Sequence, residues 1–290
     1  MLDLRLLFVA VVWGVNFSVI KHALTDFHPL GFTVIRFLLA ALFLFAVMAA
    51  TGETLAVERK DRWPLVRLGF VGITVYNILF MVGLKYTSAS HSALLISLSP
   101  LAAVLQQAVR GKERLTGPIL LGIGLATSGV IMIIRSRHGA FGFSPGQIWG
   151  DLLTLSATVA WAWYTLASRP LLANYPPITV TAYTVAAGGI LLIPAGIPDL
   201  IRQDWSALPV FSWLSLAFAA FIAAGVAYSL WYEGVKRLGV NRTIVYHYLM
   251  PFAAVLFAAF FLREKITLLQ VMGGILVLAG VAVVQRKKSS

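Results

Sequence analysis

Apolar residues along the 290-residue chain gather into ten runs that are separated by shorter polar stretches. The hydrocarbon core of a bilayer is about 30 Å thick, and about 20 residues of α-helix cross it. Because each run has about this length, the pattern predicts an all-α membrane protein with ten transmembrane helices. The expected helices cover residues 4–24, 29–50, 65–84, 91–109, 117–134, 149–168, 178–198, 210–234, 243–261 and 267–285.

The apolar pattern repeats itself in the second half of the chain. Residues 83–130 match residues 234–281 without a gap, with identity at 15 of 48 positions and a constant offset of 151. The earlier helices match with an offset of 148, so that Trp13 corresponds to Trp161. A repeat of this length outweighs any local signal. It predicts two units of five helices, residues 1–138 and residues 139–290.

The odd number of helices in each unit determines how the units are oriented. A second unit of five helices enters the membrane from the opposite side to the first, so the repeat is inverted. Cytoplasmic loops are enriched in Lys and Arg, and the two sets of alternate connections carry 15 and 7 of these residues. This asymmetry predicts cytoplasmic N and C termini. Inverted repeats are characteristic of secondary transporters, which bind substrate in a central cavity between the units.

Composition excludes several other classes of protein. With 59% hydrophobic residues, 12% charged residues and a mean hydropathy of +0.86, the chain is not an ordinary soluble protein. The net charge of +12 is spread over short clusters rather than along one face, so no nucleic-acid partner is expected. There are no cysteines, which excludes thiol chemistry and disulfides. The first apolar run lacks a clear cleavage site, so we interpret it as a retained helix rather than a signal peptide.

Two prolines, Pro100 and Pro251, occupy matching positions near the middle of the fourth and ninth expected helices. A proline removes the donor that would bond to the carbonyl four residues earlier. The carbonyls of Ile96 and His247 are therefore expected to be freed, which the membrane interior tolerates only next to protein or a water-filled cavity. The alternative is a packing kink satisfied by a neighbouring serine. Duplication at mirrored depth favours helix kinks that line a cavity.

Polar and aromatic residues at middle depth are the candidates for substrate binding. Rings with a hydrogen-bonding group suit a solute that has an apolar side chain and a polar head. An interfacial aromatic belt or plain helix packing is the alternative interpretation, and we prefer it for Trp149, which lies near the end of a run. The candidate cavity-lining residues are Trp13, Asn16, Tyr76, Asn77, Phe80, Ser97, Ser99, Trp161, Trp163, Tyr164, Tyr228, Trp231, Tyr232, Tyr246 and His247.

Few charged residues occur inside the expected helices. None of the 11 carboxylates is clearly at middle depth, which weakens the case for proton-coupled drug efflux. His247 is the best candidate for a proton relay, although a packing histidine is the competing interpretation. Arg36 either meets a substrate carboxylate or bonds to protein carbonyls. Glu113 and Glu264 precede the fifth and tenth expected helices, where we expect them to act as structural caps.

Several of these residues resemble a known family, the drug/metabolite transporter superfamily, and within it the ten-helix carriers of EamA type. The resemblance covers the whole chain and rests on Trp13, Gly14, Asn16 and Phe17 in the first helix, on Arg36, and on the duplicated prolines and glutamates. Bacterial amino-acid exporters, including aromatic amino-acid efflux proteins, are the members it resembles most. The resemblance implies a metabolite carrier of the bacterial cytoplasmic membrane whose fifth and tenth helices are peripheral.

The leading hypothesis is a secondary transporter that exports small amphipathic metabolites, foremost amino acids, by alternating access. The alternatives are a carrier or proton-coupled efflux pump for another metabolite or drug, and a membrane-embedded enzyme or sensor. No catalytic motif, phosphate loop or metal cluster occurs in the sequence, so no enzyme activity, cofactor or metal is expected. The expected partners are a small-molecule substrate and the lipid bilayer, with monomer and homodimer both open.

Overall fold

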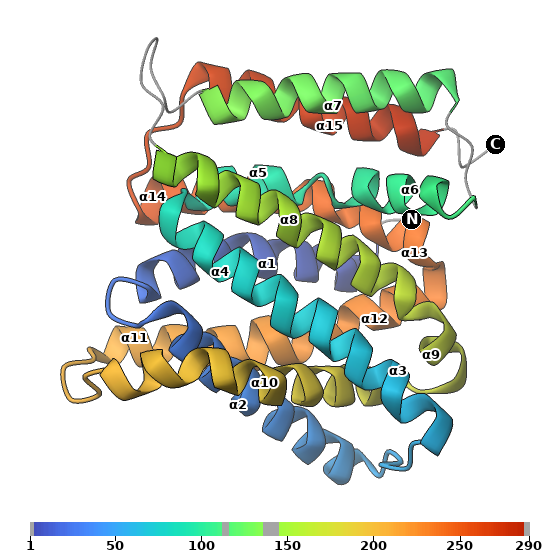
Figure 1. Ribbon diagram of the computed structural model, residues 1–290, viewed down its shortest axis with the longest axis vertical. Coiled ribbons are helices and arrows are strands. Elements are labelled where there is room, and N and C mark those ends of the chain that lie inside the picture. Colours follow the sequence, from blue (N-terminus) through green and yellow to red (C-terminus); the bar gives the residue numbers. More distant parts are fainter. Residues whose placement is uncertain (1–2, 112–115, 136–144, 287–290) are drawn as a thin grey trace.

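The computed structural model describes residues 3–111, 116–135 and 145–286, and each element in this part of the chain is a helix (Figure 1). All ten apolar runs are helical, and most of their ends lie within a few residues of the expected positions. The elements are α1 (Leu4–Ala23), α2 (Pro29–Thr51), α3 (Arg59–Gly69), η1 (Phe70–Val75), α4 (Tyr76–Tyr86), α5 (Ala89–Ile96), α6 (Ser99–Val109), α7 (Gly117–Arg135), α8 (Pro145–Ala167), α9 (Arg169–Asn174), α10 (Pro177–Arg202), α11 (Val210–Ala217), η2 (Phe218–Val226), α12 (Ala227–Leu238), α13 (Val240–Thr243), η3 (Ile244–Leu249), α14 (Met250–Phe261) and α15 (Leu268–Arg286).

Six helical segments in the described residues are long and apolar enough to cross a bilayer. Consecutive helices join to form three of them: α3, η1 and α4 run on directly, as do α11, η2 and α12, and a two-residue turn joins α5 to α6. Shorter apolar helices accompany them at 120–133, 250–261 and 268–280. This is the architecture of an all-helical membrane protein. The six segments are Leu4–Ala23, Pro29–Thr51, Arg59–Tyr86, Ala89–Val109, Pro177–Arg202 and Val210–Leu238.

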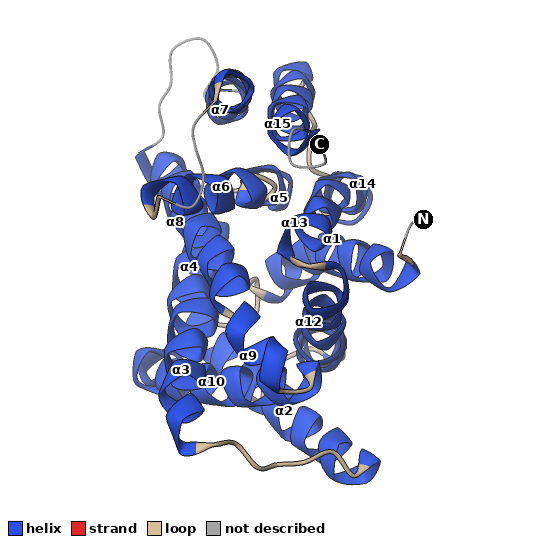
Figure 2. Cartoon of the chain, turned by 90° about the vertical axis from the view of Figure 1, so that its right-hand side faces the viewer, coloured by secondary structure: helices blue, strands red, loops and turns tan. Residues whose placement is uncertain are grey.

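Most of the helices form two groups that face each other across the centre of the molecule. In the α1 group, α1 packs against α12 and α14; in the α4 group, α8 packs against α4, α5 and α6. Figure 2 shows the two groups on opposite sides, with α2 and α10 toward one end of the long axis and α7 and α15 at the other. Each group combines helices from both predicted units, so the groups differ from the units.

Glycine allows the closest contacts inside each group. In the α1 group, a Cβ atom on Gly14 would lie 2.6 Å from Cβ of Ala253. In the α4 group, a Cβ atom on Gly83 would lie 2.7 Å from Oγ1 of Thr154. Both distances are shorter than real Cβ contacts, so only glycine lets these backbones approach so closely.

Four interruptions of the regular α-helix lie near the centre of the molecule. The segments η1 and η2 are π-helical, η3 is 3₁₀-helical, and a turn at residues 97–98 separates α5 from α6. The offset of 151 carries residues 70–75 onto 221–226 within η2, and residues 97–98 onto 248–249 at the end of η3. The prolines begin the helices that follow, because Pro100 and Pro251 lie in the first turns of α6 and α14. Such interruptions commonly mark functional sites in helices.

Glu264 caps a helix, but not the one expected from the sequence. Its carboxylate accepts hydrogen bonds from the amides of Ala89 (3.0 Å) and Ser90 (3.3 Å) and from Oγ of Ser90 (2.6 Å), so it lies at the start of α5. Oγ1 of Thr267 accepts from the amide of Gln270 (3.1 Å) at the start of α15 instead. The matching Glu113 lies outside the described residues.

The helices α7 and α15 pack against each other with crossed glycine contacts. A Cβ atom on Gly129 would lie 2.5 Å from the Gly273 carbonyl oxygen, and one on Gly280 would lie 2.5 Å from the Gly122 carbonyl oxygen. In the repeat, Gly122 corresponds to Gly273 and Gly129 to Gly280. The two contacts are therefore copies of each other, and each predicted unit supplies one helix of the pair.

We expect Gly280→Leu to destabilise the protein, because its side chain would collide with the backbone of α7. Overpacking of this kind costs about 1–3 kcal/mol, and thermal unfolding of the purified protein in detergent would measure it as a lower midpoint. The control is Gly124→Leu on α7, where an added Cβ meets nothing within 4 Å. An equal effect of both substitutions would contradict the proposed role of this contact.

Candidate functional site

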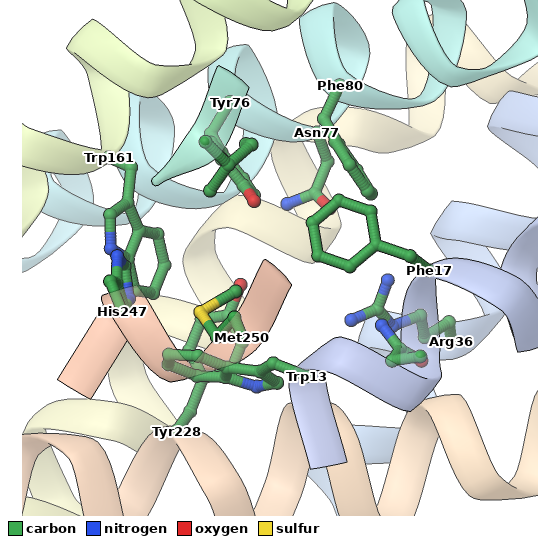
Figure 3. Close-up of a pocket in the computed structure, with 12 residues that line it drawn as sticks. Trp13, Phe17, Arg36, Tyr76, Asn77, Phe80, Trp161, Tyr228, His247 and Met250 are labelled. Atoms are coloured by element: carbon green, nitrogen blue, oxygen red, sulfur yellow. The ribbon is translucent and has the colours of Figure 1, made fainter. Parts of the chain in front are cut away.

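A small cavity lies between the α1 group and the α4 group (Figure 3). It encloses about 30 Å³, enough for about one water molecule. The side chains of Trp13, Trp161 and His247 that border it are almost fully buried. The cavity therefore lies deep inside the molecule. Its lining comprises Trp13, Asn16, Phe17, Arg36, Tyr76, Asn77, Phe80, Ile96, Trp161, Tyr228, His247 and Met250.

Much of this lining lies in the helix interruptions or directly beside them. Tyr76 and Asn77 begin α4 directly after η1, and Tyr228 follows η2. Ile96 ends α5 at the turn before Pro100, while His247 lies in η3. Irregular backbone at membrane depth is tolerated where protein or a cavity surrounds it. The cavity thus lies where four segments all depart from regular α-helical geometry.

Hydrogen bonds to π-helical carbonyls fix three of the lining side chains. Nε1 of Trp13 donates to the carbonyl of Ala223 (2.9 Å), and Nε of Arg36 donates to the carbonyl of Ala219 (3.0 Å), both in η2. In η1, the carbonyl of Ile73 accepts from Nδ2 of Asn77 (2.7 Å). These side chains donate hydrogen bonds to carbonyls of the π-helical segments, and the same bonds hold the side chains beside the cavity.

Aromatic rings form the walls of the cavity. The centroids of the Trp13 and Trp161 rings lie 5.2 Å apart at an interplanar angle of 90°, so these repeat counterparts meet edge to face across the centre. Tyr228 contacts both of them, at 5.4 Å and 5.5 Å, and Tyr76 lies 5.3 Å from Trp161. Edge-to-face and tilted pairs are the arrangements that aromatic rings prefer.

His247 joins the two groups at the cavity. Its Nδ1 lies 2.6 Å from Oγ of Ser99 in α6, and its ring stacks on Trp231 with centroids 4.5 Å apart. It also stacks on Trp161 of the α4 group, at 5.7 Å. The bond from His247 to Ser99 crosses from the α1 group to the α4 group, so separating the groups there would break it.

Four buried polar atoms of the lining have no hydrogen-bond partner within the described residues. They are Oδ1 of Asn16, Nη1 of Arg36, Nε1 of Trp161 and Nε2 of His247. Leaving a buried polar group unpaired costs about 1–3 kcal/mol, and more for a charged group. Together they offer one acceptor, two donors and a ring nitrogen that can act as either. This set can bind a solute that carries both negative and positive charge.

The candidate residues from the sequence divide between the cavity and other places. Eight line it, and Ser99 and Trp231 contact His247 beside it. The rings of Tyr164 and Tyr232 contact each other at a tilt of 32° with centroids 5.2 Å apart, and Oγ of Ser97 donates to the Leu94 carbonyl (2.6 Å). The eight are Trp13, Asn16, Tyr76, Asn77, Phe80, Trp161, Tyr228 and His247.

Two of the remaining candidates lie away from the cavity. The Trp163 ring lies beneath the Arg67 guanidinium, 5.9 Å from its centroid, and borders an outer apolar groove. The Tyr246 hydroxyl accepts from the amide of Asp3 (2.7 Å) at the start of α1. Neither residue is among those that line the central cavity.

The candidate set omitted Phe17, Arg36, Ile96 and Met250, all of which line the cavity. Phe17 follows Trp13 by four residues and so shares its helix face. Ile96 and Met250 adjoin the helix breaks at the prolines. Arg36 was weighed as a substrate contact, and its burial on α2 places its guanidinium at the cavity edge opposite Trp161 (Figure 3). No group of three or more His, Cys, Asp or Glu that could hold a metal occurs in the described residues.

Comparison with known proteins identifies the class to which this fold and cavity belong. The EamA-like transporter family matches residues 2–135 and again residues 148–286. The chain belongs to this family, and it is a multi-pass membrane transporter rather than an enzyme.

Individual relatives extend over nearly the same length. A probable terminal-alkyne amino-acid exporter of Streptantibioticus cattleyicolor is 28% identical over 97% of this chain and 92% of its own length. A probable amino-acid metabolite efflux pump of Escherichia coli is 29% identical, over 94% of this chain and 91% of its own. A solved crystal structure superposes with a TM-score of 0.71 at 23% identity, covering 98% of both chains. That structural likeness shows the fold alone.

Two buried asparagines of the cavity should respond differently to replacement by leucine. Asn77→Leu removes the donor to the Ile73 carbonyl, so we expect a loss of about 1–2 kcal/mol of stability. Asn16→Leu removes an unpaired oxygen, so we expect stability to be unchanged or higher. Thermal unfolding of both purified variants measures the difference, and a larger loss for Asn16→Leu would mean that its oxygen is paired.

Proposed function

We propose that the chain is a secondary transporter that exports amino acids across the bacterial cytoplasmic membrane by alternating access. In this proposal it has ten transmembrane helices in two inverted units, residues 1–138 and 139–290, and both termini are cytoplasmic. The observation that carries the substrate class is the small aromatic cavity whose unpaired polar atoms include Nη1 of Arg36 and Oδ1 of Asn16.

Several features support the inverted arrangement. The crossed contacts of Gly122 with Gly280 and of Gly129 with Gly273 map onto each other when the two units are exchanged. Trp13 and Trp161, which are counterparts in the repeat, meet at the cavity. The helix interruptions fall at matching positions in the two units. The excess of Lys and Arg in one set of connections, 15 against 7, supports cytoplasmic termini.

The polar groups of the cavity suit the head group of an amino acid. A guanidinium binds a carboxylate through charge-assisted hydrogen bonds, so we assign the substrate carboxylate to Arg36. Oδ1 of Asn16 would accept from the substrate ammonium, and the neighbouring face of Trp13 favours a cation electrostatically. Trp161 and His247 stand on the side opposite Arg36 (Figure 3), where they would contact the substrate side chain. An aromatic or large apolar side chain fits this wall best.

Transport requires the cavity to widen, because about 30 Å³ is far smaller than any amino acid. Rocking of the α1 group against the α4 group would open one end while the other stays closed. The Ser99–His247 bond and the rings that bridge the groups would separate on the opening side. The two relatives described above, a probable amino-acid exporter and a probable amino-acid metabolite efflux pump, support export as the direction and amino acids as the substrate class. No ATP-binding motif occurs in the sequence, so the gradient of substrate or of a coupled ion would drive the cycle.

Counterflow in proteoliposomes tests the substrate class and the role of Arg36 together. With a panel of labelled amino acids, we expect exchange above that of protein-free liposomes, and competition by the amino acid to exceed that by its amide, which lacks the carboxylate. A charge-assisted hydrogen bond contributes about 1.5–3 kcal/mol, so Arg36→Met should raise the half-saturating concentration about 10- to 100-fold. The variant should also lose the preference for the amino acid over its amide.

Arg202→Met, at the exposed end of α10, is the matched control and should behave as the unmodified protein does. Trp161→Ala should impair exchange more than Trp149→Ala, because the Trp149 side chain is 64% exposed. No exchange for any amino acid would remove this substrate class and leave another metabolite or drug. Exchange with an unchanged preference in Arg36→Met would remove the assignment of the carboxylate to Arg36.

A further inference from the structure

A carboxylate and a histidine are buried together where α4 ends, α5 begins and α8 passes both. Asp151 and His91 are each only 1% exposed. The expected helices at residues 4–24 and 149–168 place Asp3 and its repeat counterpart Asp151 near helix starts. Asp3 does cap α1, accepting from the amide of Arg5 at 3.0 Å, but α8 begins six residues before Asp151, at Pro145. The carboxylate of Asp151 is therefore inside the protein and caps nothing.

Only two described side chains contact this carboxylate closely. Oγ1 of Thr87 donates to Oδ1 of Asp151 at 2.6 Å, and Nδ1 of His91 lies 3.8 Å from the same oxygen. His91 supplies the one basic nitrogen within 4.0 Å of it among the described residues. A buried carboxylate is stable when it is protonated or paired with a cation. One proton shared by Asp151 and His91 provides either arrangement.

Other charged groups at this end of the molecule are engaged in contacts of their own. Nζ of Lys21 in α1 donates to the carbonyls of Leu84 and Thr87, both at 2.6 Å. Glu264 holds the first amides of α5. Lys21 and Glu264 thus bind backbone groups at the end of α4 and the start of α5, beside Asp151 and His91. Further ionisable residues near this end are Lys85 and Tyr86 in α4, Arg135 at the end of α7, and Arg263 and Lys265 beside Glu264. His22 follows Lys21 in the last turn of α1, and its ring meets Phe211 edge to face with centroids 4.9 Å apart.

The same contacts tie the two groups of helices together. Lys21 belongs to α1 yet holds the carboxyl end of α4, and Glu264 follows α14 yet holds the amino end of α5. Further along α5, Ile96 lines the central cavity. Separation of the groups at this end would break both ties and admit water to Asp151. In water the carboxylate no longer needs a proton, so opening and proton release are linked.

We propose that Asp151 and His91 form a proton-binding site that holds one proton while this end of the cavity is closed and releases it when the end opens. Acid therefore favours the closed end. With this end facing outward, closure takes up one proton from outside and opening returns it there, so the external pH sets how readily this end opens. The proposal rests on alternating access as described above, but its test does not use the transported substrate.

The absence of native cysteine makes a single introduced thiol a clean reporter of this opening. Ser92 is buried and its Oγ has no hydrogen-bond partner among the described residues. It lies four residues before Ile96, on the face of α5 that leads to the cavity. In spheroplasts carrying Ser92→Cys, the rate of labelling by a membrane-impermeant maleimide measures how often the outward end opens.

The labelling rate is compared with that of Ser92→Cys combined with Asp151→Asn, since Asn keeps an acceptor for Thr87 but does not titrate. The second variant also corrects for the ionisation of the thiol itself. Release of one proton per opening changes the opening equilibrium by up to about tenfold per pH unit. We expect the labelling rate of Ser92→Cys, divided by that of the variant that also carries Asp151→Asn, to rise with external pH by up to this factor.

A ratio that stays constant with pH, or an absence of labelling at every pH, would overturn the proposal. His91→Gln provides the same comparison if Asp151→Asn does not insert, and a rise that requires sodium would assign the site to that ion instead. Failure of every amino acid to exchange would count against the proposed substrate class and leave the labelling result standing. The two hypotheses are thus tested separately.

Discussion

The structure depends on one constraint, which is that backbone carbonyls released from α-helical bonding in a membrane must be satisfied inside the protein. All four helix interruptions accordingly meet near the centre of the molecule. Two of their carbonyls, those of Ala219 and Ala223, accept from Arg36 and Trp13. These side chains are held in place by the irregular backbone that they satisfy. The cavity thus forms because several helices are interrupted at one depth. Its polar side chains are held in position by their hydrogen bonds to the carbonyls of the interrupted segments.

The scaffold of the cavity is symmetric, whereas its chemistry is not. Trp13 and Trp161 are counterparts, as are Asn77 and Tyr228, and all four line the cavity. The offset of 148 carries Arg36 onto Thr184 and Asn16 onto Tyr164, and neither of these lines it. The only arginine of the lining is therefore on one side, which would orient an amphipathic substrate. In the proposed alternating access, the symmetric arrangement of helices would let the cavity close in an equivalent way at either end. The unpaired polar groups would distinguish the two ends of the solute.

Much of the fold could be predicted from the sequence, because long apolar runs and a gapless repeat are signals of the whole chain. The cavity was predicted in part. Depth along a run identified Trp161 and Trp163 alike, but residues two apart point to different sides of a helix, and only Trp161 faces the centre. The π-helical segments are invisible to periodicity because they are as apolar as their surroundings. The burial of Asp151 could not be predicted either, because it depends on which elements pack beside α8 rather than on the local sequence.

The crossed glycine contact between α7 and α15 has a further meaning for the pairing of the two halves. Each unit carries both glycines needed for the contact, since Gly122 pairs with the counterpart of Gly129, and Gly129 with the counterpart of Gly122. The contact is self-complementary, as in a homodimer with two-fold symmetry. In the inverted arrangement proposed above, two copies of one half-length chain could pair in opposite orientations through this surface. In a single chain each half can change alone, and only one half supplies an arginine to the cavity.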